Sequence, residues 1–313
     1  TAGVIVSGAF CGSNISPLSG TTNLAASVGE ISIYKHIKSL LTTDIPAWAI
    51  CLILYTFLGL NSKNVSLGAV HQMMAGLQNG FWISGWALLP VLLLIVLAIF
   101  QVPAIPSLGL GSLFAVVLGW IHAPKTSLTT ITNTIMTGYV SHTGDKTIDT
   151  LLSKGGISSM LTSLALIIFA LALGGLLIKF NIISAIINHL TGIVKTPGRL
   201  AFSTALTCIG VNLLVGEHYL AIILPGQSFL PSFDKLGLKR VDLTRILNDA
   251  GAAVNAIVPW SVSGVFIAST LQINPLNFIP WAFFPFFVTI LTIIAGMLVK
   301  VPVKSPAANL ATE

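Results

Sequence analysis

The chain has 313 residues, of which 54% are hydrophobic and only 8% are charged, and its net charge is +6. A soluble globular domain carries roughly a quarter of charged residues, so this composition excludes an ordinary soluble enzyme. Uncharged apolar runs long enough for a hydrocarbon core of roughly 30 Å recur along the chain. The sequence therefore predicts an all-α membrane protein, a polytopic helical bundle in a lipid bilayer. The basic residues lie in short connecting segments without a basic patch studded with aromatic residues, so no nucleic-acid partner is expected.

The chain begins at Thr1, inside an apolar stretch that has no basic region before it. A signal peptide would need such a region. We therefore expect residues 1–313 to form one transmembrane transporter domain that lacks its N-terminal part.

Five apolar runs are predicted to be ordinary transmembrane helices, namely 45–60, 81–100, 105–122, 160–178 and 279–299. The first is placed between Asp44-Ile45-Pro46 and Asn61-Ser62-Lys63, which are typical of a helix start and a helix stop. Residues 101–104 leave room only for a tight turn, so 81–122 is predicted to be a helical hairpin.

Three further apolar regions are interrupted by polar residues, glycine or proline. They are 1–28, broken at 12–23; 200–230, broken at 215–218; and 251–271, broken around 259–261. Irregular backbone at membrane depth needs protein or water around it rather than lipid. Many transporters build their sites from such discontinuous helices, so we interpret these regions as a solute pathway.

The basic residues indicate the topology. If 200–230 is a re-entrant hairpin, eleven basic residues share one side and four the other, which makes the first side cytoplasmic. The eleven are Lys35, Lys38, Lys179, Lys195, Arg199, Lys235, Lys239, Arg240, Arg245, Lys300 and Lys304; the four are Lys63, Lys125, Lys146 and Lys154. A hairpin that crossed fully would nearly remove this bias.

This topology predicts an inverted repeat. Residues 1–60 would end the first repeat and 160–299 would form the second, with opposite orientations in the membrane. A hairpin matching 200–230 should then precede Thr1. The segment 124–158 is expected to be an external loop with part of an amphipathic helix, and 231–250 a short interfacial helix.

Two acidic residues are candidates for the chemistry. Seven of the nine acidic residues are assigned to loops or tails, whereas Glu217 and Asp249 lie at the interrupted regions. Glu217 is interpreted as a proton-binding or cation-binding carboxylate at the hairpin tip, with a solvated turn as the alternative. Asp249 is either a helix N-cap, a cation ligand or both.

Neutral oxygen atoms cluster around Pro17 and Gly20. They suit Na⁺, which is a hard cation, while the N-termini of half-helices would suit an anion. The candidates are Ser16, Ser19, Thr21, Thr22 and Asn23, with Asn255 and Ser261 as counterparts in the third interrupted region. A Na⁺ site is expected among Glu217, Asp249, Thr22 and Asn23. No cofactor motif is present in the sequence, so Na⁺ and H⁺ are expected only as transported or coupling ions.

Five stretches of the sequence resemble the NhaC-type sodium/proton antiporter family. They are GAFCGSNISPLSGTTNLA at 8–25, KGGISSM at 154–160, LALGGLL at 171–177, GEHYLAIILPGQ at 216–227 and the segment 249–260. They follow the family order over nearly the whole chain, which corresponds to the C-terminal two-thirds of a full member. The resemblance implies inverted repeats with hairpins, and an elevator-like or rocking mechanism.

The chain departs from the family pattern at several positions. The family has aspartate at the positions of Ser13 and Gly20 and an acidic residue at that of Ile178. It has Asp-Gln where this chain has Glu217-His218, and asparagine where it has Ser261. The loss of carboxylates weakens the Na⁺/H⁺ assignment and raises the alternative of an organic-solute exchanger, because malate–lactate sodium antiporters are similar proteins.

Three hypotheses therefore stay open. The first is a Na⁺/H⁺ antiporter that works by alternating access in the inner (cytoplasmic) membrane. The second is a Na⁺- or H⁺-coupled exchanger of a small organic anion or amino acid. The third is a non-transporting, degenerate relative. A homodimer is possible under each of them, and none decides the oligomeric state. The sequence contains no nucleophile–base pair or metal motif that would favour an enzyme.

Overall fold

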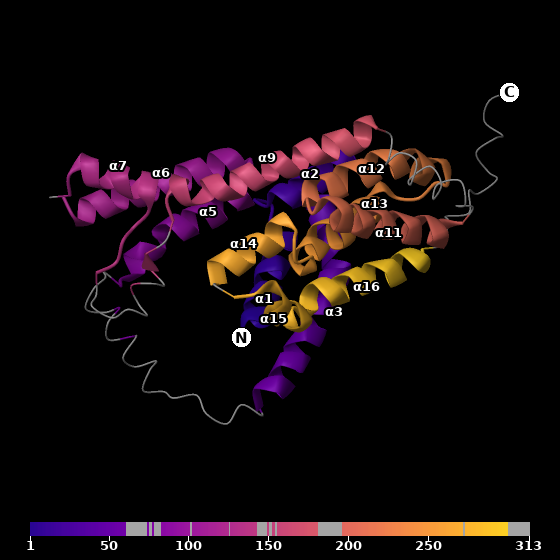
Figure 1. Cartoon of the computed structure of the whole chain (residues 1–313), viewed down its shortest axis with the longest axis horizontal. Coiled ribbons are helices and arrows are strands. Elements are labelled where there is room, and N and C mark those ends of the chain that lie inside the picture. Colours follow the sequence, from indigo (N-terminus) through magenta and orange to yellow (C-terminus); the bar gives the residue numbers. More distant parts are fainter. Residues whose placement is uncertain are drawn as a thin grey trace. The chain divides into compact units, whose positions relative to one another are not determined.

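The protein is described by a computed structural model that covers residues 1–60, 83–100, 102–124, 126–142, 155–180, 196–271 and 273–299, with 74, 77, 149, 152 and 153 as isolated residues. Every regular element within these ranges is a helix (Figure 1). For the described residues, the predicted all-α class is confirmed. The chain divides into two compact units, one made of 1–55 with 169–313 and the other of 56–168.

The described residues contain three helices that are long and apolar enough to cross a membrane. They are α3 (Ile33–Leu60), α6 (Ala104–His122) and α11 (Pro197–Val215). Two bent pairs raise the number to five if each is one span: Arg240–Ile257 with Val262–Leu271, bent by 44°, and Pro275–Trp281 with Phe283–Met297, bent by 51°. The outward face of α3 carries exposed Leu52, Ile53 and Phe57, which suits lipid better than water.

The smaller unit contains η1 (Gly85–Leu88), α5 (Leu89–Ile99), α6, α7 (Leu128–Thr137) and the first part of α9 (Ile157–Lys179). Within this unit, α5 and α6 pack against each other. A Cβ atom on Gly111 of α6 would lie only 2.7 Å from Leu94 of α5, so glycine permits the close approach. The predicted spans 105–122 and 160–178 match α6 and α9 closely. Of the expected loop 124–158, the described part includes α7, whereas 125, 143–148, 150, 151 and 154 lie outside the described residues.

The larger unit is built around the hairpin of α11 and α12 (His218–Lys235). The other elements are α1 (Ala2–Ile15), α2 (Gly20–Val28), α3, α13 (Arg240–Ile246), η2 (Leu247–Ala252), η3 (Ala253–Ile257), α14 (Val262–Leu271), α15 (Pro275–Phe278), η4 (Ile279–Trp281) and α16 (Phe283–Met297). α11 packs along α12, and the core of this unit includes the buried Phe229 and Phe233 of α12 with Ile246 of α13. In Figure 1, α11, α12 and α13 are drawn in orange tones and α16 in yellow, whereas α1, α2 and α3 are drawn in indigo and purple.

The predicted start of the first span is wrong. α3 begins at Ile33 rather than Ile45 and runs through Pro46 without a break over 28 residues. Proline removes one main-chain hydrogen bond from a helix interior. The helix persists because buried residues on both sides of the proline, such as Leu40 and Cys51, hold it against its neighbours. Lys35 and Lys38 therefore lie in its first turns and not in a loop.

The predicted boundary of the third interrupted region is also wrong. The segment 231–250 is not an interfacial helix, because α12 continues to Lys235 and a helical stretch from Arg240 to Ile257 follows. Leu243 and Ile246 of that stretch are fully buried. The break itself lies at 258–261, where proline and serine predict it, and the breaks at 16–19 and 216–217 also fall where expected.

Candidate ion-binding site

Asp249 lies in a widened turn in the middle of the helical stretch 240–257. Residues 247–252 form η2, a short π-helix, and all six are buried. Insertions of this kind are rare inside helices and are frequent at functional sites. Because α13 has Lys239 as its N-cap, the interpretation of Asp249 as a helix N-cap is wrong.

Both carboxylate oxygens of Asp249 accept hydrogen bonds from other helices. Thr43 of α3 donates its hydroxyl to Oδ2 at 2.8 Å, and Asn14 of α1 donates its amide to Oδ1 at 3.1 Å. The main-chain carbonyl of Asp249 accepts from Thr289 of α16 at 2.9 Å. Three other helices, α1, α3 and α16, therefore converge on this one buried residue.

Asp44 is the partner that the sequence analysis missed. The sequence predicts it in a loop, but it lies within α3 and is only 2% exposed. The same amide nitrogen of Asn14 that reaches Asp249 also donates to Asp44 Oδ1 at 3.2 Å. No described residue donates to Asp44 Oδ2, which is buried. Asn14 thus bridges two carboxyl groups, and one of their oxygens is open to a cation or a proton.

A sequence signal for Asp44 exists in the spacing of buried residues along α3. Leu40, Thr43, Asp44, Ala47 and Cys51 recur at three- and four-residue intervals, which places them on one face of a helix. This pattern crosses Pro46. Pro46 is typical of a helix start, so the sequence alone does not indicate that the pattern continues upstream of it.

The break between α1 and α2 holds Asn14 in place. α1 ends at Ile15, and the hydroxyl of Thr22 in α2 donates to the carbonyls of Ser13 and Asn14 at 3.1 and 3.0 Å. These carbonyls belong to the last turn of a helix, where main-chain acceptors lack helical partners. Thr22, predicted as an ion ligand, is fully buried and closes this turn.

The other neutral oxygens of the turn bond mainly with one another. Asn23 donates its amide to the carbonyls of Pro17 and Ser19, and Ser16 accepts from the N–H of Leu18. The hydroxyls of Ser19 and Thr21 lie 3.0 Å apart. These predicted ligands are brought together within one turn, next to Asn14.

Glu217 occupies the hairpin tip and is fully buried. Its Oε2 accepts from the N–H of Leu220 at 2.9 Å, so it is the N-cap of α12. Its Oε1 receives no hydrogen bond from any described residue, although His218 Nδ1 lies 3.7 Å away. A left-handed Gly216, with φ of 74°, ends α11 just before it.

The hairpin tip contacts both helix breaks. The carbonyl of Gly216 accepts from the N–H of Val262 at 2.9 Å and from the amide of Asn255 at 3.2 Å. On the other side, a Cβ atom on Gly20 would lie 3.2 Å from the hydroxyl oxygen of Tyr219. The polar residues of all three interrupted regions are therefore gathered in one part of the larger unit.

Asn255 and Ser261 form a second polar cluster, joined by Asn212. Asn255 donates to Asn212 Oδ1 at 2.8 Å and accepts from the N–H of Ser263 at 3.0 Å. Ser261 donates to the carbonyl of Asn255 and accepts from the N–H of Gly264. Asn212 also donates to the carbonyl of Gly251 at 2.6 Å, and it was not predicted as a site residue. No hydrogen bond among the described residues joins Glu217 to Asp249, so the two predicted carboxylates belong to different clusters.

Comparison with known proteins identifies the family. Residues 8–299 match the model of the Na⁺/H⁺ antiporter family. The chain belongs to this family. Its members are transporters rather than enzymes, and the resemblance seen in the sequence motifs is confirmed. No solved structure matches the chain.

Relatives in the family carry different cargoes. The chain is 38% identical to the Na⁺/H⁺ antiporter NhaC of Bacillus subtilis, over 96% of the chain and 67% of the relative. It is 34% identical to a malate-2H⁺/Na⁺-lactate antiporter of the same organism, over 94% and 63%, and 32% identical to the arginine/ornithine antiporter ArcD of Halobacterium salinarum, over 98% and 65%. The chain thus spans about two thirds of the length of the relatives it matches.

Proposed function

We propose that the complete protein is a secondary active Na⁺/H⁺ antiporter of the cytoplasmic membrane, in which Asp44 and Asp249 carry the exchanged ion. The observation that supports this most directly is the bridge by Asn14, whose amide nitrogen reaches a carboxylate oxygen of each residue. Asp44 and Asp249 come from different helices, and both are buried.

The physical basis of the exchange is repulsion between two carboxylates. Two negative charges that share a buried site destabilise each other, and a proton or a cation relieves the repulsion. Oxygen atoms of Asp44, Asp249 and Thr43 are hard ligands of the kind that small hard cations prefer. Because Na⁺ and H⁺ would relieve the same repulsion, binding of one excludes the other, which is the requirement for antiport.

We place the remaining predicted ligands in supporting positions around this pair. Thr22 bonds to the carbonyl of Asn14, so the turn of Ser16, Ser19, Thr21 and Asn23 would set the position of the bridge. Glu217, Asn255 and Ser261 would line the path at the hairpin tip, where the buried Glu217 Oε1 receives no hydrogen bond from the described residues. We propose that Na⁺ reaches the pair past these groups.

The architecture that we propose for transport is an inverted repeat. The break at 16–19 precedes α3, and the break at 258–261 precedes the bent pair that ends with α16. Both breaks contact the tip of the α11–α12 hairpin, which we infer to be re-entrant. Movement of this assembly against the rest of the protein would give alternating access.

A second function, exchange of a small organic anion or amino acid coupled to Na⁺ or H⁺, is favoured by a different observation. Ser13 and Gly20 put no carboxylate at the first break, and α2 begins there without a side-chain cap. Uncapped N–H groups at a helix start favour an anion. Relatives named for malate, lactate, arginine and ornithine exchange support the same function.

Flux measurements on the full-length protein in proteoliposomes would separate these functions. Under the first proposal, an inward Na⁺ gradient drives proton efflux from the vesicles without any organic solute. Flux that requires malate, lactate, arginine or ornithine would replace it by the second. Absence of flux with any of these solutes would contradict both and leave a non-transporting relative.

A further inference from the structure

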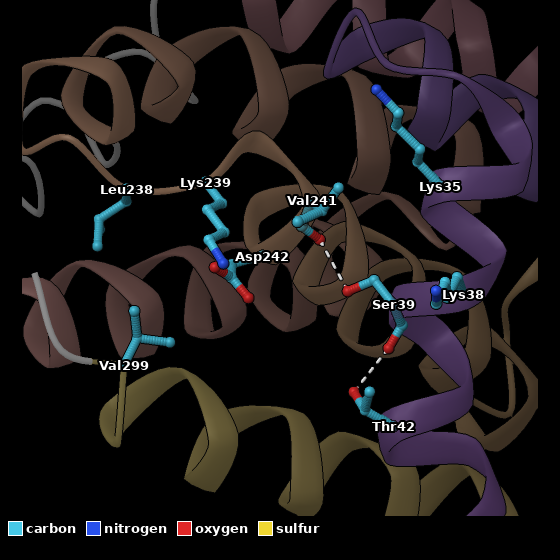
Figure 2. A pocket seen from close by; sticks show the side chains of 9 residues that line it. All are labelled: Lys35, Lys38, Ser39, Thr42, Leu238, Lys239, Val241, Asp242 and Val299. Atoms are coloured by element: carbon cyan, nitrogen blue, oxygen red, sulfur yellow. Dashed lines mark hydrogen bonds between the residues drawn. The ribbon is translucent and has the colours of Figure 1, made fainter. Parts of the chain in front are cut away.

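A basic pocket opens at the end of the larger unit where α3 begins. It has a volume of about 570 Å³ and is enclosed by the first turns of α3, the segment 238–242 and the end of α16 (Figure 2). Its lining residues are Lys35, Lys38, Ser39, Thr42, Leu238, Lys239, Val241, Asp242 and Val299. Three lysines from two separate segments therefore line one cavity.

Among the described residues, the three lysines have no acidic partners of the kind that the neighbouring arginines have. Arg240 pairs with Glu30 and Asp234, and Arg245 pairs with Asp242 at 3.1 Å. None of Lys35, Lys38 and Lys239 forms an ion pair within the described part of the chain. The one acidic group of the pocket is thus already engaged, and the positive charge around the cavity is left for an anion from outside.

The remaining lining is partly apolar. Leu238, Val241 and Val299 contribute side chains without polar atoms, and the hydroxyls of Ser39 and Thr42 donate to carbonyls of Val241 and Ser39 (dashed in Figure 2). A small inorganic anion gains nothing from apolar walls, whereas a phospholipid headgroup carries its glycerol and acyl carbons with it. Mixed walls therefore favour a lipid.

The position along the helices agrees with a lipid ligand. Lys35 and Lys38 lie in the first two turns of α3, whose remaining turns are apolar enough to cross a membrane. Val299 follows the end of α16, the second half of a bent pair that could be one span. Lysines at the ends of membrane-crossing helices lie at the level of the lipid phosphates.

We propose that this pocket binds the phosphate of an anionic phospholipid headgroup. Lys35, Lys38 and Lys239 would hold the phosphate oxygens, and the apolar residues would contact the glycerol and the first acyl carbons. Basic pockets between membrane helices are a known chemical solution for such headgroups. This proposal does not depend on which solute the protein transports.

A ligand bound in the pocket would also stabilise the contact between α3 and α13. Ser39 donates to the carbonyl of Val241 at 3.3 Å and accepts from Arg245 at 3.3 Å, and Thr43, one turn further along α3, reaches Asp249. A headgroup held by lysines on both sides would cross-link the same two segments. Binding should therefore raise the unfolding temperature.

The test uses the delipidated full-length protein in a neutral detergent. Short-chain phosphatidylglycerol, short-chain phosphatidylcholine and inorganic phosphate are titrated separately, and binding is followed by the unfolding temperature. The variant K35Q/K38Q/K239Q removes the pocket charge, and K35R/K38R/K239R keeps it. The matched control K179Q/R199Q/K235Q removes three charges from exposed positions outside the pocket.

Each lysine near an anionic headgroup contributes about a fivefold gain in affinity, so loss of three should weaken phosphatidylglycerol binding on the order of 100-fold. The arginine variant and the control should bind as the unaltered protein does, and phosphatidylcholine should bind weakly to all. Equal binding by the glutamine variant and the unaltered protein would overturn the proposal. An equal loss of phosphatidylglycerol affinity in the K179Q/R199Q/K235Q control would also overturn it, because the lipid would then be attracted by surface charge in general. Stabilisation by inorganic phosphate without any by phosphatidylglycerol would make the pocket a site for free phosphate.

Discussion

Asn14 is central at the residue scale because one side-chain amide serves two carboxyl groups. An asparagine that only stabilised the helix break would not need acidic partners from α3 and η2. The two acidic partners instead bring two carboxyl groups into one buried site, where a proton or a cation would reduce their repulsion. The position of Asn14 is set in turn by Thr22, which bonds to its carbonyl.

A substitution at Thr22 separates a structural role from a role in ion binding. Thr22→Val removes the hydroxyl that satisfies the carbonyls of Ser13 and Asn14. The Ser13 carbonyl still accepts from the N–H of Ser16, but the Asn14 carbonyl is left without a donor among the described residues. A buried acceptor without a donor costs about 1–3 kcal/mol, so the free energy of unfolding should fall by this amount. Thr22→Ser keeps the hydroxyl and should restore stability in thermal unfolding. A changed affinity for Na⁺ in Thr22→Val at unchanged stability would instead make Thr22 a direct ligand.

Glu217 can be tested without disturbing the fold. Glu217→Gln keeps an oxygen that can accept from the N–H of Leu220, so the cap of α12 is retained. If Glu217 lines the ion path, the loss of its charge should abolish exchange in proteoliposomes or shift its pH profile. Transport that is unchanged in both rate and pH profile would remove Glu217 from the proposed site and leave it a helix cap.

At the scale of elements, the tip of the α11–α12 hairpin depends on a tight turn at Gly216. Its φ of 74° is unfavourable for residues with a Cβ atom, and such an atom would lie 3.2 Å from Ser261 Cα and 3.3 Å from the carbonyl oxygen of Trp260. The turn and the break at 258–261 therefore fit each other closely.

Gly216→Ala should lower stability and transport together, because it strains the turn and pushes the hairpin tip away from the second break. Gly237→Ala is the matched control, since Gly237 has φ of 67° but nothing within 4 Å of the added atom. It should cost only the conformational strain of about 1–2 kcal/mol and leave transport intact. Equal effects of the two substitutions on transport would contradict the contact between tip and break.

The breaks could be predicted from the sequence because each interrupts a long apolar run with glycine, proline or hydroxyl residues. The extent of α3 could not be predicted in the same way. Asp44 and Pro46 together are typical of a helix start, and only the packing on both sides of the proline keeps the helix continuous. For the same reason, the sequence does not predict Asp44 as a residue of the candidate site.

The pairing of Asp44 with Asp249 had no local signal at all. It depends on α1, α3 and η2 meeting in the folded protein, and a hydrogen bond between residues so distant in the chain leaves no spacing in the sequence. The sequence predicts Asp249 as a site residue because it is acidic and lies beside an interrupted apolar region. It does not predict the environment of Asp249, because the π-helical turn that carries this residue follows from packing rather than from residue preference.

At the scale of the whole molecule, family membership and the buried carboxyl pair support one account. A multi-pass helical protein of the Na⁺/H⁺ antiporter family holds two buried acidic side chains, and no basic side chain of the described residues is bonded to either. Charged groups in a membrane interior are costly, which supports the proposal that this pair handles an ion. Relatives with organic cargoes share the family, so the cargo must be decided by measurement.

The most direct measurement is proton release when Na⁺ binds to the purified full-length protein in weakly buffered solution. If Na⁺ and H⁺ share the Asp44–Asp249 pair, added Na⁺ displaces a proton and the solution becomes more acidic, more so at a pH where the pair holds its proton. Asp44→Asn and Asp249→Asn should each abolish the release, whereas Asp234→Asn, which removes an exposed carboxylate paired with Arg240, should not change it. Release that persists in full in both Asp44→Asn and Asp249→Asn would contradict the account.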